Sequence, residues 1–394
     1  MLCPSIPGHD VALVAGSKSG DGPAIMGNLA SHRSDTAPMA MESISIRRRA
    51  VRDFPPAYFA LVMATGMLSI ACNQEGLLRL SWVFLSIATA ALLVLAGITL
   101  LRLVWFPRSV YHDFRDHNRG VGFFTIIAGV TVLGSAIHTI TTLFTLPYAL
   151  WILGISLWSL LTYSIFAAFI MKRNKPPLRS GLNGGWLLAV VATDSVALLT
   201  LVLLPDLRSH VATMLFLALA FWLCGGMLYI WMISLLFYRY TFYVHLPSDV
   251  LPWYWVDMGA MAMATVVGDL LLKRIHGSPF ADLMPFIKGL TIMFWATATW
   301  WIPMLLIFSV WRHCVTPGPP VYSPSYWSIV FPLAMYAVAT DRIAELSEIV
   351  YLHVIARLLV YVAITLWVLI GLGMVRAILN LFSLEEVSKD LRFT

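Results

Sequence analysis

One ionisable side chain lies in the middle of a long apolar stretch: Asp194, between Thr193 and Ser195. A carboxyl group inside a membrane-spanning segment is energetically costly and usually faces the protein interior or a cavity. Such a group can exchange a proton and so couple transport to H⁺, or it can tune selectivity. Alternatively, Asp194 is a structural residue, protonated or hydrogen-bonded to its neighbours. The sequence leaves both interpretations open.

A second candidate is Phe331, which is followed directly by Pro332. A phenyl ring that projects into a narrow apolar lumen blocks hydrated ions, and a hydrophobic constriction can gate a channel by dewetting. The alternative is that Phe331 packs between helices, as most phenylalanines of membrane proteins do.

Five apolar stretches begin with aromatic residues and recur once per pair of stretches, which indicates a repeat architecture. When their starts are aligned, residues 63–66, 128–131, 191–194, 259–262 and 331–334 fall at one level. We predict that this level surrounds a pore, with Phe331 and Pro332 as its gate. The predicted pore-lining residues are Met63, Gly66, Gly129, Thr131, Asp194 and Gly259.

The other titratable residues near these stretches favour structural roles. Asp257 is expected to cap a helix or to lie at the membrane interface. Asp269 precedes Lys273 by four residues, a spacing that favours an ion pair on a helix surface. His138 could sense pH, but a hydrogen-bonded structural histidine is the preferred interpretation. Arg357 is expected to pair with a glutamate of the preceding loop, or to snorkel.

No metal or cofactor site is predicted. The four cysteines are scattered and form no metal-binding or disulfide pattern. Motifs for nucleotide binding, zinc-dependent proteolysis and serine hydrolysis are absent. One loop has residue types that bind metals, but their spacing matches no known site, so we expect it to be a solvated loop. Its residues are His112, Asp113, Asp116 and His117.

Helices that cross a membrane must position these candidates. The chain has 394 residues, of which 59% are hydrophobic and 12% are charged. Soluble domains carry about 25% charged residues, and a spanning helix needs about 20 predominantly apolar residues. We therefore predict one all-α integral-membrane domain over residues 54–382. Its ten spans are predicted at 55–73, 81–105, 121–143, 147–171, 185–204, 211–238, 252–272, 285–311, 325–346 and 353–382.

The odd and even spans differ in composition. Even spans are continuously apolar, whereas odd spans contain more glycine, serine, threonine and proline. Small residues allow helices to approach closely, and backbone that such residues loosen is tolerated only inside the protein or beside a wet cavity. We therefore place the odd helices inside and the even helices against lipid. Short links make each sequential pair a helical hairpin.

Charge placement predicts the orientation. Arginine and lysine concentrate before the first span and in the loops after the even spans. Cytoplasmic loops are enriched in basic residues, so both termini are predicted to be cytoplasmic. Residues 1–53 have the composition of a disordered cytoplasmic tail, and residues 383–394 would form a short C-terminal tail. The net charge of +6 gives no separate support for nucleic-acid binding.

Three segments together carry a family resemblance: FPPAYFALVMATGMLSIA (54–71), WVDMGAMAMA (255–264) and YWSIVFPLAMYAVAT (326–340). They resemble the tellurite-resistance/dicarboxylate transporters, which are relatives of the slow anion channels of plant guard cells. The resemblance covers residues 54–382 and leaves out the N-terminal tail. Each segment alone is a weak motif, but the combination is specific.

The resemblance implies a quasi-five-fold ring of five hairpins, whose odd helices line a central pore, and a homotrimer with one pore per subunit. Members place an occluding phenylalanine on the ninth helix, which matches Phe331. Their activities include monovalent-anion conduction, C4-dicarboxylate transport and sulfite efflux, and tellurite resistance is a phenotype of some members. The chain lacks the long phosphorylatable termini of the plant channels, so kinase control is not expected.

The preferred hypothesis is a plasma- or inner-membrane channel or transporter for small inorganic or organic anions, gated by Phe331. The alternative is a proton-coupled carrier of C4-dicarboxylates such as malate, or of sulfite, in which Asp194 titrates. A membrane-embedded enzyme is the least favoured, because it would gather ionisable groups at one depth and here they are scattered.

Overall fold

The computed structural model describes residues 46–207, 210–244, 252–315 and 322–393. All regular structure in these residues is helical. Residues up to 45 of the predicted disordered tail lie outside the described chain. The tail prediction is wrong for the segment that follows, because Ile46–Arg52 form the short helix α1. Arg102 donates a hydrogen bond from Nε to the Arg52 carbonyl oxygen and so connects α1 to α3 (Leu78–Trp105).

Each predicted odd span is an α-helix that a short 3-10 helix precedes. The pairs are η1 (Pro56–Tyr58) and α2 (Phe59–Gln74), η2 (Gly120–Phe123) and α5 (Phe124–Thr141), η3 (Gly184–Leu187) and α8 (Leu188–Leu203), η6 (Pro252–Trp255) and α10 (Val256–Arg274), and η8 (Pro324–Tyr326) and α12 (Trp327–Ser347). Proline suits these starts because its missing N–H is not needed in a first turn. The shared aromatic starts of the sequence are therefore a repeated structural element.

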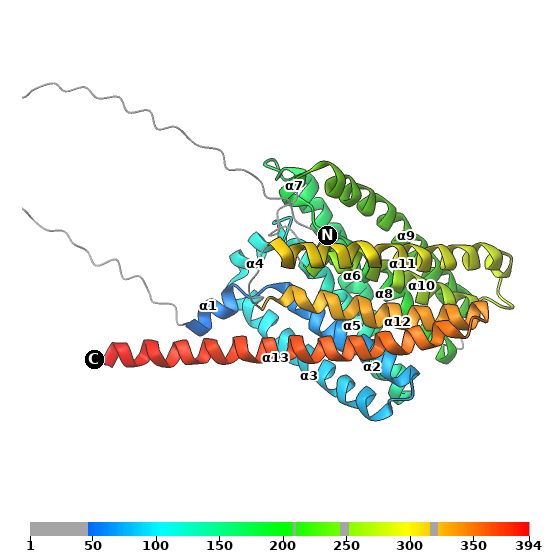
Figure 1. The fold of residues 1–394 in the computed structure, drawn as a ribbon, viewed down its shortest axis with the longest axis horizontal. Helices are drawn as coiled ribbons and strands as arrows, with labels where there is room; N and C mark the ends of the chain where they lie inside the picture. The colour runs from blue at the N-terminus through cyan, green and yellow to red at the C-terminus, as the bar shows by residue number, and fades with distance from the viewer. Residues whose placement is uncertain (1–45, 208–209, 245–251, 316–321, 394) are drawn as a thin grey trace, which may run out of the picture. The chain divides into compact units, whose positions relative to one another are not determined.

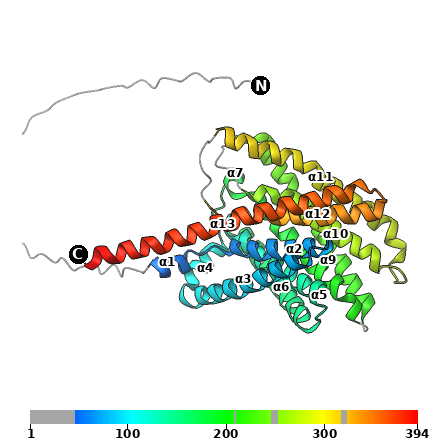
Figure 2. The same cartoon turned by 60° about the horizontal axis from the view of Figure 1, so that its bottom comes forward.

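The predicted even spans are longer helices: α3 (Leu78–Trp105), α6 (Thr145–Met171), α9 (Val211–Phe242), α11 (Met284–Val315) and α13 (Tyr351–Phe393). Shorter elements are α4 (Pro107–Phe114), α7 (Leu178–Gly181), η4 (Leu204–Asp206) and η7 (Ala281–Leu283). Helix α13 continues through the predicted C-terminal tail to Phe393, and its end extends beyond the other helices (Figures 1 and 2).

Nine helices of the described chain are long and apolar enough to cross a membrane, one fewer than predicted. The exception is α12. Its last two turns carry Asp341, Arg342 and Glu345, which lower its apolar character. Most of the residues of α12 are nevertheless buried, so this helix avoids lipid through its protein neighbours.

Burial separates the two sets of helices as the sequence predicted. In the spans of α2, α5, α8 and α10, 78–94% of the most apolar window is buried inside the protein, against 11–39% for α3, α6, α9, α11 and α13. Helix α2 packs against α5, α5 against α8, α8 against α10, α10 against α12, and α12 against α2. These five inner helices thus form a closed cycle, and each also packs against the outer helix that follows it.

Indole N–H groups of the outer helices connect neighbouring hairpins. Each of these tryptophans donates a hydrogen bond to the inner helix of the next hairpin, at 2.7–3.1 Å. The bonds are Trp158 to Thr193 Oγ1 (α6 to α8), Trp222 to the Ala264 carbonyl (α9 to α10), Trp295 to Thr340 Oγ1 (α11 to α12) and Trp367 to Thr65 Oγ1 (α13 to α2). Trp151 adds a second bond between α6 and α8, to Thr200.

Ion pairs lie at the end of the inner helices. Lys273 Nζ lies 2.9 Å from Asp269, which confirms the predicted pair, and 2.8 Å from Glu345 of α12. The pairing expected for Arg357 with a glutamate of the preceding loop is wrong: its Nε lies 2.9 Å from Glu75 at the end of α2. Tertiary packing brings the end of α2 close to Arg357, so the ion-pair partner is Glu75 and not a glutamate that is near in sequence.

The loop with metal-binding residue types is only partly solvated, since His112 is exposed whereas Asp113 and His117 are buried. Asp113 is buried and pairs with Arg102 and Arg119. The His117 ring stacks on Phe169 with centroids 4.4 Å apart, and burial lowers the pKa of this histidine. In the described chain no group of three or more His, Cys, Asp or Glu residues could hold a metal ion. The loop therefore anchors the start of the bundle.

Removing one indole donor tests the connection between hairpins. We expect Trp367→Phe to lower the free energy of unfolding by about 1–2 kcal/mol, because one interhelical hydrogen bond and part of the packing are lost. The measurement is denaturation of the detergent-solubilised protein, followed by circular dichroism. Trp82→Phe is the control, since Trp82 lies on α3 with 51% of its surface exposed; an equal loss in both variants would contradict the assignment.

Candidate functional site: the centre of the helix ring

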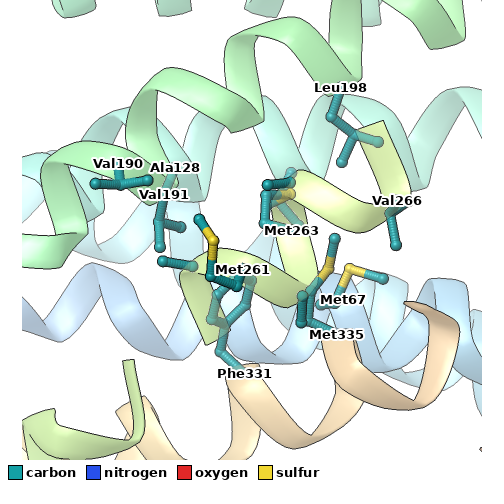
Figure 3. Close-up of a cluster of buried hydrophobic side chains, with 14 of the residues drawn as sticks. Met67, Ala128, Val190, Val191, Leu198, Met261, Met263, Val266, Phe331 and Met335 are labelled. Carbon is teal, nitrogen blue, oxygen red and sulfur yellow. The ribbon is translucent and has the colours of Figure 1, made fainter. Parts of the chain in front are cut away.

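Apolar side chains from all five inner helices meet in one cluster (Figure 3). Phe331 of α12 lies beside Met261 of α10, with Val191 of α8 and Ala128 of α5 close by. Met67 of α2 and Met335 of α12 belong to the same cluster. These side chains are 0–1% exposed. The place where a pore was predicted is therefore filled by aliphatic, thioether and phenyl groups.

The backbone beside Phe331 is held by a close helix contact. A Cβ atom on Gly259 of α10 would lie 2.7 Å from Cγ of Pro332. Only glycine lets α10 approach the proline ring this closely. Pro332 lies inside α12 and lacks an N–H, so it also interrupts the hydrogen-bond ladder of that helix. The predicted residues Gly259 and Pro332 thus form the α10–α12 contact that positions Phe331.

Two other predicted glycines lie where α2 meets α5. A Cβ atom on Gly129 would lie 3.3 Å from the carbonyl oxygen of Phe59, and one on Gly66 would lie 3.5 Å from Cγ1 of Val132. Met63, four residues before Met67 on α2, is fully buried in the same core. The small residues predicted to line the pore therefore serve close helix packing in this structure.

The hydroxyl groups of the inner helices have partners inside the protein. Thr131 Oγ1 lies 2.8 Å from Ser195 Oγ, to which it donates, and 2.9 Å from the Ile127 carbonyl oxygen. Thr65 and Thr193 accept hydrogen bonds from the tryptophans of outer helices. Such bonds satisfy polar groups where no water competes. They also leave these hydroxyls engaged between helices.

Asp194 lies between α8 and α9. Its carboxyl group is fully buried, and neither oxygen has a hydrogen-bond partner. The nearest feature of α9 is Gly225: a Cβ atom at that position would overlap the carboxyl oxygen Oδ1. Thr193 and Ser195, the neighbours considered from the sequence, bond to other groups. The structure therefore brings Asp194 against an outer helix and does not join it to the cluster around Phe331.

Asp257 was predicted to be a capping or interfacial residue, and it is instead fully buried. Its Oδ2 accepts a hydrogen bond from the Tyr240 hydroxyl at 2.8 Å, and its carbonyl oxygen accepts one from Tyr229 at 3.1 Å. Trp301 donates to Tyr229 in turn, at 2.9 Å. This network joins α9, α10 and α11.

His138 has the partner that a structural histidine needs. Its Nε2 lies 2.6 Å from Oδ2 of Asp206 in η4, so the pair connects the ends of α5 and α8.

The methionines at the centre were not identified from the sequence. Met67, Met261 and Met335 lie in the three segments that carry the family resemblance, but they are uncharged and were given no role there. Their thioethers and the phenyl ring of Phe331 offer no hydrogen-bond donor to an anion. Apolar side chains therefore fill the centre of the helix ring.

Comparison with known proteins agrees with this architecture. A family model described as voltage-dependent anion channel matches residues 53–375. Two proteins of Methanocaldococcus jannaschii, each named an uncharacterized transporter, are similar: one is 22% identical over 75% of this chain and 86% of its own length, the other 23% identical over 78% and 88%. An uncharacterized membrane protein of Mycobacterium tuberculosis is 31% identical over 37% of this chain and 75% of its own length.

Enlarging Gly259 tests the contact that positions Phe331. We expect Gly259→Ala to lower the free energy of unfolding by about 1–3 kcal/mol, because the new methyl group forces Pro332 and its helix to shift. The control is Gly97→Ala on α3, where nothing lies within 4 Å of the added atom. Detergent-based unfolding curves of both variants give the comparison. Equal stability of the two variants would show that α10 and α12 are not tightly apposed.

Proposed function

Because the chain belongs to the voltage-dependent anion channel family, we propose that this membrane anion channel or transporter passes small anions through the centre of its helix ring, with Phe331 as the gate. The relatives named as transporters agree with transport rather than enzymatic catalysis. The observation that carries the proposal is the burial of Phe331 among side chains from all five inner helices.

The proposed pore follows from the cycle of inner helices. Ten helices would form five hairpins in a quasi-five-fold ring. Helix α12 would be the tenth membrane-spanning helix, despite the charged residues in its last two turns. The outer helices present many exposed apolar side chains, which suits contact with lipid acyl chains. We further propose a homotrimer in the cell membrane with both termini cytoplasmic, on the basis of the family resemblance and of the basic loops.

An apolar gate accounts for closure by simple physics. An anion that enters the cluster must give up hydration, and neither a phenyl ring nor a thioether replaces the lost hydrogen bonds. A hydrophobic constriction of this kind stays dry and blocks ions until it widens. Small anions of low hydration energy, and C4-dicarboxylates if the opening is wider, are the proposed substrates.

A proton-coupled C4-dicarboxylate or sulfite carrier is the second candidate, and one observation favours it. The carboxyl group of Asp194 is buried in the middle of a span without a hydrogen-bond partner. Such groups in membrane spans often take part in proton relays. The contact with Gly225 of α9 separates Asp194 from the proposed path, so coupling would have to act through the position of α8.

Shortening the gate side chain tests the first proposal. We expect Phe331→Ala to raise anion conductance in planar bilayers above that of the wild type, because the ring that fills the centre is removed. The recordings would compare chloride, nitrate, malate and sulfite under identical gradients. The matched control is Phe294→Ala, since Phe294 is also buried but lies on the outer helix α11; a conductance unchanged by Phe331→Ala would contradict the gate.

Replacing the buried carboxyl group separates the two candidates. Asp194→Asn keeps the shape but cannot exchange a proton. A carrier that uses Asp194 would lose malate uptake driven by a pH gradient in proteoliposomes and would keep downhill flux. If the protein is a channel, Asp194→Asn would keep the wild-type conductance, and its anion flux would still not depend on the pH gradient. Driven uptake that survives the substitution would eliminate the carrier mechanism based on this residue.

A further inference from the structure

We propose that the path is closed at two successive levels, and that Met67 and Met335 form the second, one helical turn from Phe331. This inference rests on the proposed function, since it concerns the same central path. It assigns a barrier role to two methionines beyond the phenylalanine gate.

Helical spacing places the two levels. Phe331 and Met335 are four residues apart on α12, and side chains at this spacing share one face of a helix. Met63 and Met67 have the same spacing on α2, which packs directly against α12. One turn of helix advances about 5.4 Å along its axis. The second level therefore lies one turn further along both helices.

The side chains at the second level belong to one buried cluster on helices that pack against each other. Figure 3 shows Met67 of α2, Met335 of α12 and Val266 of α10 in this cluster. Met67 is 1% exposed and Met335 is 0% exposed. Neither side chain is directed toward lipid, and together they occupy the centre between α2, α10 and α12. A side chain in this place would obstruct a path even after the ring of Phe331 had moved.

The hydroxyl groups beside Met67 on α2 are already engaged. That of Thr65 accepts the hydrogen bond of Trp367, and that of Ser69 is bonded to the carbonyl oxygen of Ser81. The thioethers of Met67 and Met335 themselves offer an anion no hydrogen-bond donor. Widening one level leaves the other dry.

The two levels differ in stiffness. A phenyl ring is rigid and swings as one unit, whereas methionine has three rotatable side-chain bonds and adapts to its surroundings. The methionine level can therefore open by rotamer changes without movement of the backbone, once the ring of Phe331 has left the centre. We assign the rigid gate to Phe331 and the adaptable one to the methionine pair.

Conductance measurements on single and double variants test this inference. Two barriers in series limit current together, so removing one leaves the other limiting. We expect Met335→Ala alone to conduct little more than the wild type, because Phe331 still closes the path. Phe331→Ala should conduct more, and Phe331→Ala/Met335→Ala should exceed the sum of the increases of the two single variants. Phe331→Ala/Met67→Ala should behave in the same way, which gives a second variant if the first folds poorly.

The control is Phe331→Ala/Met232→Ala, which removes a buried methionine of the outer helix α9. It should conduct like Phe331→Ala. All variants would be compared at equal elution volume and helix content. If both central methionine variants conduct no more than Phe331→Ala, the second level is overturned while the proposed function stands. If no variant passes any anion, the proposed function fails and this inference fails with it.

Discussion

The structure depends on one constraint: inside a bilayer, a polar group must find its hydrogen-bond partner within the protein. Threonine hydroxyls on the inner helices meet this constraint by accepting indole N–H groups from the outer helices of neighbouring hairpins. The same bonds hold the hairpins in order around the ring. Because these threonine hydroxyls are bonded to the outer helices, apolar side chains fill the centre of the ring. The apolar filling of the centre and the assembly of the ring thus have a common cause.

The sequence predicted the helices well because their signals are local. Aromatic starts, proline and glycine at first turns, and the contrast between polar and apolar spans all lie within a few residues of each other. They gave the boundaries of the inner helices, each of which begins with a 3-10 turn. The interior position of Phe331 followed from the same alignment and is consistent with its full burial.

The direction in which side chains point could not be predicted in the same way. Successive residues of a helix are rotated by about 100°, so an alignment of repeats gives the depth of a residue but not the neighbour that it faces. Asp194 has the expected depth and yet contacts Gly225 of an outer helix. Thr131 bonds to Ser195, and Arg357 pairs with Glu75, 282 residues away along the chain. These contacts depend on tertiary packing, which no local pattern encodes.

One joint of the ring differs from the other four. Indole bonds from α6, α9, α11 and α13 span four joints, whereas in the described chain α3 donates no such bond to α5. Where α2 meets α5, the close contacts include Gly66 against Val132 and Gly129 against the carbonyl oxygen of Phe59. Such a seam resists separation but offers little resistance to sliding. Dilation of the ring would therefore be uneven, with shear concentrated at this seam and the other four joints moving as a single stiff arc.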